Sequence, residues 1–307
     1  MEDLNRYIEL NNGNKMPLVG YGTFSGEEEK ELHDCIVHAI VELGYRHLDT
    51  AKLYGNEEVI GCALQECFEK GIKREDLFIT TKVWREDYHD VESAIKESLR
   101  KLQLEYLDLY LIHWMVTDID WKNLDVKGPT MQETWKQMEG IYEEGLSKNI
   151  GVSNCPVMMY LDLLAGAKVK PQVNQIETNP HFQQKALIEF TRKFGTESTA
   201  YAPIGAQKFT GNGSLFDNED LKSIADKHGV SVPQICLAWN INRGVAVIPK
   251  STNKDRMKAN FEALSITLDE DEMATISKLD KNERFFDPAK WENETGEEDW
   301  DNSPIWA

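Results

Sequence analysis

Basic residues are scarce in this sequence of 307 residues, which has 34 Lys and Arg against 53 Asp and Glu. The resulting formal charge of −19 makes nucleic acids and anionic membrane surfaces poor partners, because both are themselves negative. The opening residues MEDLNRYIEL lack the basic start and apolar run of a signal peptide. The longest apolar-rich stretch, LDLYLIHWMV, is about half of what a membrane span needs. We therefore expect a cytoplasmic protein that binds neither nucleic acid nor membranes.

Cysteine is also sparse, and the five cysteines are scattered without a Cys-x-x-Cys pair. An odd, dispersed set predicts reduced thiols in a reducing compartment rather than disulfides. The seven histidines are likewise dispersed and form no His-Glu-x-x-His pattern. We therefore expect no metal centre.

Short apolar, β-branched or aromatic runs recur along the chain and are typical of buried strands. A first pair of runs flanks Asn12-Gly13, which predicts a hairpin over about 7–17. Eight further runs follow: LVGYG, YRHLDT, LFITTKV, LDLYLIHW, NIGVSN, PQVNQIE, STAYAPIG and VAVIPKS. Between them lie segments with apolar residues at helical spacing.

Several of these intervening segments carry helix start and stop signals. Capping boxes are predicted at Ser25 with Glu28, at Thr130 with Glu133 and at Ser231 with Gln234. The glycines at 44, 145 and 244 are the corresponding stops. Eight strands alternating with helices predict a (β/α)₈ barrel of the TIM type, because eight parallel strands are the number that closes such a barrel. We expect one domain over 1–307, with a long C-terminal loop or tail over about 283–307.

A doubly wound sheet is the alternative architecture, and GYGTFSG resembles its dinucleotide-binding motif. The spacing does not fit, because the third glycine of G-x-G-x-x-G would fall at Ser25. No acidic residue ends a second strand in the usual way about 20 residues later. The barrel is therefore the preferred prediction.

A barrel enzyme should carry its chemistry at the C-terminal ends of its strands. Polar residues stand at those ends in this sequence: Asp49, Lys82, His113, Ser153, Asn154, Gln175, Tyr201 and Lys250. Each alone has an ordinary structural explanation, such as a lysine that reaches solvent or a hydrogen-bonded core histidine. Together they indicate one active-site rim.

Asp49, Tyr54, Lys82 and His113 suggest proton transfer to or from a carbonyl or alcohol oxygen. They contain neither a nucleophile paired with a base nor the two close carboxylates of a glycosidase. A tyrosine hydroxyl has a pKa near 10, and an ammonium group beside it is expected to lower that pKa. Asp49 would hold Lys82 by an ion pair, and His113 can hydrogen-bond the same oxygen. Hydride transfer from a nicotinamide is the matching chemistry at carbon.

Seven blocks occur in the order found in the aldo-keto reductases: LDTAKLYGNEEVIG, TTKVW, DLYLIHW, IGVSN, VNQIE, AYAPIG and VIPKSTNKDRMKANF. The resemblance runs from about Ile8 to the C-terminus and, by RFFDPAKW and the ending PIWA, is closest to the aldose reductase and xylose reductase branch. It implies NADP(H) as cofactor and NADPH-dependent reduction of aldehydes, aldoses and some ketones. Asp49, Tyr54, Lys82 and His113 match the catalytic tetrad, with Tyr54 as the general acid.

The resemblance also implies a cofactor site along the rim. Ser153, Asn154 and Gln175 would hold the carboxamide, Tyr201 would stack on the nicotinamide ring, and Thr23 would lie near the ribose. The adenosine 2′-phosphate would be held by Lys250, Ser251, Asn253 and Arg256. Asn260 would reach the adenine. Charge supports this independently, because basic residues at 250, 254, 256 and 258 interrupt an acidic chain. Basic groups at a helix start oppose its dipole, so phosphate recognition is the better explanation.

Substrate preference is less well specified by the sequence. Phe24, Trp114 and Trp306 are expected to line the substrate pocket, although ordinary packing at the barrel edge is an equal alternative. Phe24 replaces a Trp common in the family, Ala202 a Ser, and Ala259 a Glu, while HWMV lacks the usual Pro. The partner is expected to be a small carbonyl compound, and the chain a monomer or weak dimer. A hydroxysteroid or prostaglandin reductase, or a regulatory protein that binds the cofactor, remain alternatives.

Overall fold

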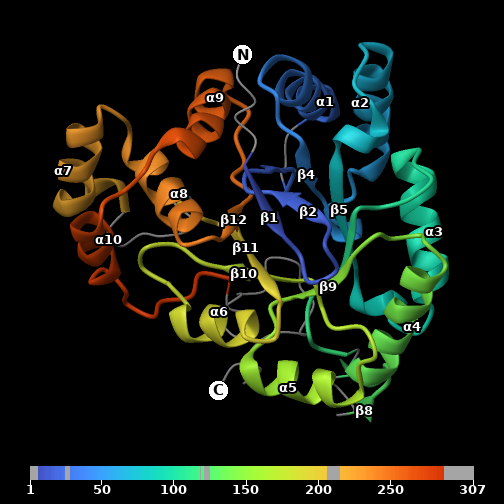
Figure 1. The fold of residues 1–307 in the computed structure, drawn as a ribbon. Helices are drawn as coiled ribbons and strands as arrows, with labels where there is room; N and C mark the ends of the chain where they lie inside the picture. The colour runs from blue at the N-terminus through green and yellow to red at the C-terminus, as the bar shows by residue number, and fades with distance from the viewer. Residues whose placement is uncertain (1–5, 25–27, 118, 121–124, 206–214, 287–307) are drawn as a thin grey trace.

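The computed structural model describes residues 6–24, 28–117, 119–120, 125–205 and 215–286. Eight parallel strands form its central sheet, with helices packed around them (Figure 1). These strands are β3 (Tyr21–Gly22), β4 (His47–Asp49), β5 (Phe78–Val83), β6 (Leu109–Ile112), β9 (Ile150–Ser153), β10 (Val173–Glu177), β11 (Glu197–Tyr201) and β12 (Ala246–Val247). Seven of them lie within the runs predicted from the sequence, and β11 begins at Glu197, one residue before the run STAYAPIG.

The sheet closes into a barrel where its first and last strands meet. The strand order runs from β12 through β11, β10, β9, β6, β5 and β4 to β3. A parallel bridge joins Val19 to Val247, and Gly20 N donates to the Val247 carbonyl over 2.8 Å. The predicted (β/α)₈ barrel is therefore confirmed.

Helices follow the strands and cover the outside of the barrel (Figure 1). They are α1 (Glu29–Val37), α2 (Glu57–Glu69), α3 (Val91–Leu102), α4 (Met131–Glu143), α5 (Val157–Gly166), α6 (Lys185–Arg192), α7 (Glu219–His228), α8 (Val232–Asn242), α9 (Lys254–Glu262) and α10 (Glu270–Ser277). The capping boxes at Thr130 and Ser231 are present as predicted. The box predicted at Ser25 is not: Glu28 is the N-cap of α1 and makes no side-chain cap, and Ser25 lies outside the described residues.

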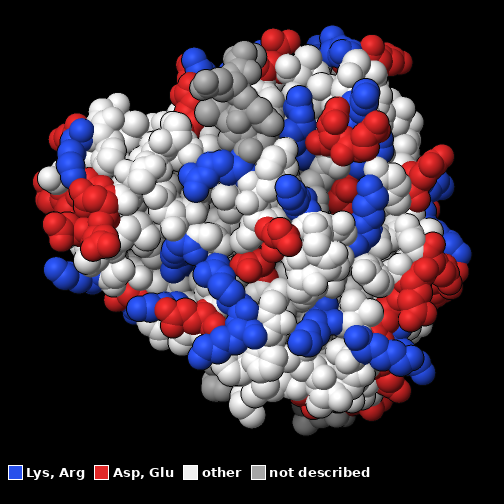
Figure 2. Space-filling model, viewed as in Figure 1, with Lys and Arg blue, Asp and Glu red and all other residues white. Residues whose placement is uncertain are grey.

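The predicted hairpin closes the end of the barrel where the strands begin. It consists of β1 (Tyr7–Glu9) and β2 (Lys15–Pro17), paired antiparallel. Asn12 and Asn14 at its turn both donate to the Asn149 side chain, which directly precedes β9. In the view of Figure 2, Lys and Arg lie over this end with some acidic residues among them, and a large acidic cluster lies over α7 and α10. Because this end is closed by the hairpin, the open mouth is at the C-terminal ends of the strands.

Three smaller features complete the description. A second short pair, β7 (Ile119–Asp120) with β8 (Asp125–Val126), precedes α4. No helix in the described part of the chain is long and apolar enough to cross a membrane. All five cysteines are free thiols.

The buried His47 on β4 leads to a testable prediction about the stability of the protein. Its ring is buried between the Thr80 hydroxyl at 3.1 Å and the Pro17 carbonyl at 3.3 Å. Burial lowers the pKa of His47 to about 4, so the folded protein keeps this ring neutral below pH 6.5, where the unfolded chain protonates it. The contribution of His47 to the free energy of unfolding should be fully present above pH 6.5. It should fall by about 1.4 kcal/mol per pH unit from there down to about pH 4.

Urea unfolding between pH 7 and pH 4 measures this effect. In the variant His47→Gln, the free energy of unfolding should fall less steeply with decreasing pH. The difference in slope should correspond to about one proton. His89→Gln, which removes an exposed imidazole, is the matched control and should keep the wild-type slope. Equal slopes in all three proteins would contradict the assignment to His47.

Candidate active site

Lys82 and Asp49 form a buried ion pair at the ends of β5 and β4. Lys82 Nζ donates to Asp49 Oδ1 over 2.7 Å and to the Thr50 carbonyl over 2.8 Å, and the lysine side chain is fully buried. The other carboxylate oxygen of Asp49 accepts from Gln175 Nε2 over 2.7 Å. Burial lowers the pKa of Lys82, whereas the Asp49 charge raises it, so the ammonium group depends on its carboxylate.

Tyr54 is brought to this pair by a short helical turn. The turn Lys52–Tyr54 follows β4 and ends at Gly55, whose φ of +66° lies in the left-handed region that glycine tolerates. Lys82 Nζ donates a third hydrogen bond to the Tyr54 hydroxyl oxygen over 3.3 Å. Since that oxygen accepts from the ammonium group, the phenolic proton is available to a ligand at the mouth.

His113 completes the group from the end of β6. Its ring lies edge-on to Tyr54, with 5.8 Å between centroids, and the side chain is buried. Burial and the Lys82 charge hold the pKa of His113 well below its usual value, so the ring is neutral at pH 7. His113 Nδ1 is buried and has no hydrogen-bond partner among the described residues. The neutral ring beside the Tyr54 phenol can hydrogen-bond the oxygen of a carbonyl or alcohol bound there.

The expected direction of the Tyr54 pKa shift is wrong. The structure raises the pKa of Tyr54 well above 10, because burial disfavours the phenolate and the Asp49 charge adds to that effect. Although Tyr54 as a residue is partly exposed, its hydroxyl group lies among Asp49, Lys82 and His113. Tyr54 therefore keeps its proton at neutral pH, which suits an acid rather than a base.

A second set of polar residues lies beside the tetrad, at the ends of β9, β10 and β11. Ser153 Oγ donates to the Gln175 carbonyl over 2.9 Å, and Asn154 Nδ2 donates to Ser153 Oγ over 3.1 Å. The Tyr201 hydroxyl donates to Asn154 Oδ1 over 2.6 Å. These residues thus form one hydrogen-bonded row that meets the tetrad through Gln175 and Asp49. The row is where the sequence predicted the nicotinamide.

The predicted phosphate-binding residues lie between the end of β12 and the start of α9. Arg256 Nε donates to Ser251 Oγ over 3.3 Å, and Asn253 caps the helix by accepting from Arg256 N. Cationic side chains, a hydroxyl and a helix N-terminus together suit a phosphate group. The backbone is close-packed here: a Cβ on Gly22 would lie 2.7 Å from the Ile248 carbonyl oxygen. Thr23 is buried, and its hydroxyl donates to the Asp49 carbonyl over 2.9 Å.

Comparison with known families agrees with this geometry. The sequence profile described as the Aldo/keto reductase family matches residues 18–281. The chain belongs to the aldo/keto reductase family. Its matched region contains every tetrad residue and the whole predicted phosphate-binding segment.

This aldo/keto reductase is similar over its length to characterised relatives. It is 39% identical to the NAD(P)H-dependent D-xylose reductase of Scheffersomyces stipitis, over 98% of this chain and 99% of that one. It is 40% identical to aldose reductase B of Dictyostelium discoideum, over 90% of this chain and 93% of that one. Its fold matches the crystal structure of a Bombyx mori aldo-keto reductase in complex with NADP, with a TM-score of 0.87 and 35% identity over 94% and 96% of the two chains.

Of the three residues predicted to line the substrate pocket of this aldo/keto reductase, the two that the structure describes differ in their exposure. Phe24 is 57% exposed at the mouth, and its ring centroid lies 5.0 Å from that of Tyr54. Trp114 is buried, and its carbonyl accepts from the Tyr88 hydroxyl over 2.6 Å. Trp306 lies outside the described residues. Phe24 therefore lies at the mouth beside Tyr54 and Trp114 is buried, and the pocket-lining roles of Phe24, Trp114 and Trp306 stay predictions.

Three residues at the mouth were not assigned a role by the sequence. The Trp84 ring stands edge-on to His113 at 5.2 Å, and Asn56 Nδ2 donates to the Thr23 carbonyl over 2.9 Å. Glu177 is fully buried at the end of β10. Trp84 directly follows β5, Glu177 ends β10, and Asn56 comes two residues after the turn that follows β4. All three lie in the sequence blocks quoted above, and that position was the available signal.

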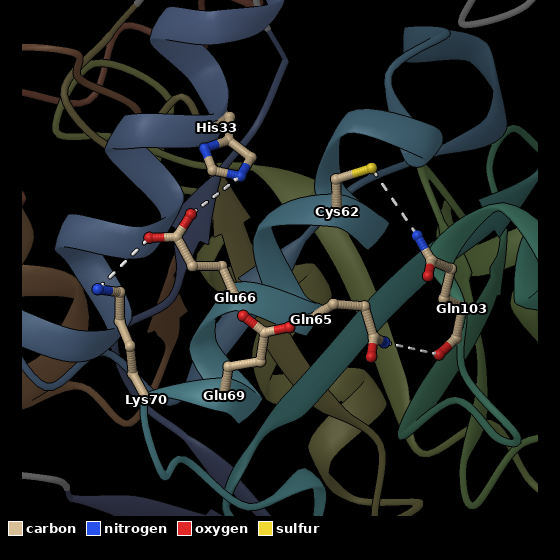
Figure 3. A pocket seen from close by; sticks show the side chains of 7 residues that line it. All are labelled: His33, Cys62, Gln65, Glu66, Glu69, Lys70 and Gln103. Carbon is tan, nitrogen blue, oxygen red and sulfur yellow. Dashed lines mark hydrogen bonds and ion pairs between the residues drawn. The ribbon is translucent and has the colours of Figure 1, made fainter.

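A separate hollow lies on the outer surface, between α1, α2 and the end of α3 (Figure 3). Several of its polar groups pair with one another: His33 Nε2 is 3.5 Å from Glu66, which is also 3.5 Å from Lys70. Gln65 donates to the Gln103 carbonyl over 3.2 Å. No group like Asp49, Lys82 and Tyr54 lines this hollow among the described residues, so the barrel mouth is the candidate active site.

Proposed function

We propose that this protein is an NADPH-dependent reductase that converts aldehydes, aldoses and some ketones to alcohols. The observation that carries the proposal is the Tyr54 hydroxyl, which accepts from a buried ammonium group 3.3 Å away and faces the neutral His113 ring. This is a phenol placed to give a proton to a carbonyl oxygen at the barrel mouth. Reductases of xylose and aldoses among the relatives support the substrate class.

Each residue of the tetrad has a separate role in proton transfer to the substrate oxygen. Tyr54 gives the proton, and His113 orients the oxygen through a neutral ring nitrogen. Lys82 stabilises the phenolate that remains after proton transfer, and Asp49 keeps Lys82 charged and in place. Because burial raises the pKa of Tyr54, its phenolate is costly without the ammonium group. The buried ion pair is therefore part of the proton donor.

The residues present fit NADP(H) along the rim. Ser153, Asn154, Gln175 and Tyr201 would hold the nicotinamide end beside the tetrad, with Thr23 near the ribose. The phosphate end would lie on Lys250, Ser251, Asn253 and Arg256, with Asn260 near the adenine. When bound, reduced nicotinamide supplies a hydride to the carbonyl carbon. A crystal structure of a relative contains NADP, which supports this choice.

The purified protein tests the proposal directly. NADPH and NADH oxidation should be followed with xylose, glucose, glyceraldehyde, an aromatic aldehyde and a keto-steroid. We expect turnover of aldoses or small aldehydes with NADPH preferred. Preference for the keto-steroid would favour a hydroxysteroid-type reductase, and cofactor binding without turnover of any carbonyl would favour a regulatory protein.

Arg256 should decide the preference between the two cofactors. Its guanidinium group is exposed beside Ser251, where only the 2′-phosphate of NADPH would use it. Arg256→Ala should raise the KM for NADPH about 10–100-fold, the range expected for a lost charged hydrogen bond, and leave the KM for NADH unchanged. Lys258→Ala, on the same helix but paired with Glu262, is the control. Equal losses with both cofactors would contradict phosphate recognition.

Two further properties stay predictions from the sequence. We propose a cytoplasmic location, because all five scattered cysteines are free thiols. We also propose a monomer or weak dimer, which light scattering of the purified chain would test.

A further inference from the structure

Glu177 is a buried carboxylate that the proposed mechanism does not use. It ends β10, two residues beyond Gln175, and has no exposed surface. Because alternate residues of a strand point to the same side, Glu177 belongs to the same face of β10 as Gln175, which bonds Asp49. A buried carboxylate needs hydrogen-bond donors, and here they come from the far end of the described chain.

The donors are backbone amides of two consecutive residues. Phe285 N donates to both carboxylate oxygens of Glu177, over 2.9 and 3.2 Å, and Phe286 N donates to Oε2 over 2.9 Å. Such charge-assisted bonds are stronger than those between neutral groups. Glu177 thus holds the polypeptide backbone itself, so replacing either phenylalanine side chain would leave the attachment intact.

The attached segment contacts the row predicted to hold the nicotinamide. The Phe286 ring stands edge-on to the Tyr201 ring, with 5.6 Å between centroids and 78° between planes. Two other contacts fix the approach: Lys281 N donates to the His181 carbonyl over 2.9 Å, and the Arg284 guanidinium lies 5.0 Å above the Phe182 ring. The segment 281–286 is therefore held along the loop after β10 and ends against Tyr201.

We propose that Glu177 is a positioning residue that ties residues 285 and 286 to the rim, so that Phe286 supports Tyr201 against the nicotinamide. This inference rests on the proposed function, because it takes Tyr201 as the residue that stacks on the cofactor. Losing the tie releases Phe286 from Tyr201 and weakens cofactor binding, while the tetrad stays in place. The signature is thus an effect on binding with little effect on kcat.

Limited trypsin digestion tests the tie without any assay of activity. The peptide bond after Arg284 includes the Phe285 amide that Glu177 binds, whereas the bond after Lys281 lies outside this contact. In Glu177→Gln, cleavage after Arg284 should rise about tenfold relative to cleavage after Lys281, which corresponds to about 1.4 kcal/mol of opening free energy. Glu283→Gln makes the same charge change at an exposed side chain and should digest like wild type.

Cofactor binding tests the consequence. Fluorescence titration should give a Kd for NADPH about five- to tenfold higher in Glu177→Gln than in wild type, with kcat within about twofold. Phe286→Leu keeps the backbone tie and should raise the Kd similarly while its digestion stays unchanged. This second variant keeps the test valid if Glu177→Gln folds poorly.

The outcomes separate this inference from the proposed function. Unchanged digestion in Glu177→Gln would overturn the tie, and faster digestion with an unchanged Kd in both variants would overturn the support of Tyr201. A wild-type protein that binds NADPH but reduces no carbonyl would end the proposed function. It would leave both measurements able to decide the role of Glu177.

Discussion

Tyr54→Phe is expected to lower kcat for carbonyl reduction by about 10²–10⁴-fold and to leave the Kd for NADPH within about twofold of wild type. The variant removes only the hydroxyl that accepts from Lys82 over 3.3 Å. The ring, including its packing against Phe24, stays. Because nothing in the predicted cofactor row depends on that hydroxyl, the loss should fall on the chemical step. Single-turnover kinetics and fluorescence titration measure the two quantities.

Tyr160→Phe is the matched control for this substitution. It also removes a buried phenolic hydroxyl, which is hydrogen-bonded to Thr196 on the outer layer of the barrel. We expect some loss of stability in this control and wild-type kcat. If NADPH binding were lost together with turnover in Tyr54→Phe, the role of Tyr54 as the proton donor would be wrong.

Lys82→Met should both inactivate the protein and destabilise it. The substitution leaves the buried Asp49 carboxylate without its cation, and breaking a buried pair on one side costs about 3–5 kcal/mol. Turnover should fall at least about 10²-fold, since the Tyr54 phenolate loses the charge that stabilises it. Urea unfolding and steady-state kinetics on the same preparation measure both effects.

The double variant Asp49→Asn with Lys82→Met separates stability from catalysis. An amide at position 49 removes the unpaired charge and still accepts from Gln175 Nε2, so most of the lost stability should return. Turnover should not return, because the ammonium group beside Tyr54 is still missing. Recovery of activity together with stability would contradict the role of Lys82 in the proton donor.

The position of the tetrad could be predicted because each member follows a recognisable strand. β-Branched and aromatic runs such as LFITTKV and LDLYLIHW predicted β5 and β6, and the barrel topology brings the strand ends to one rim. Asp49, Lys82 and His113 therefore had to lie near one another once the fold was known. Residue type at a strand end was enough.

The degree of burial of polar groups, and contacts between residues distant in sequence, could not be predicted in this way. The sequence shows that Lys82 is near Tyr54, but it does not show how completely their polar ends are removed from water. Burial reverses the expected shift of the Tyr54 pKa. Glu177 lies in a quoted block, but its attachment to residue 285 could not be predicted, because the Phe285 amide lies 108 positions away. The start of α1 was missed since Ser25 resembles a cap, whereas Glu28 occupies that position.

Closure of the barrel by the meeting of β3 and β12 also has a consequence for synthesis and folding. The Tyr21 hydroxyl donates to the Ser251 carbonyl, 230 positions along the chain, and Val19 bridges to Val247. Contacts this distant in sequence form late and slowly, because most of the chain must be ordered before they contribute favourable free energy. A chain still on the ribosome before β12 emerges would have an open sheet edge at β3, exposed to pairing with other chains. Expression of this protein should therefore depend on chaperones more strongly than the stability of its finished barrel would suggest.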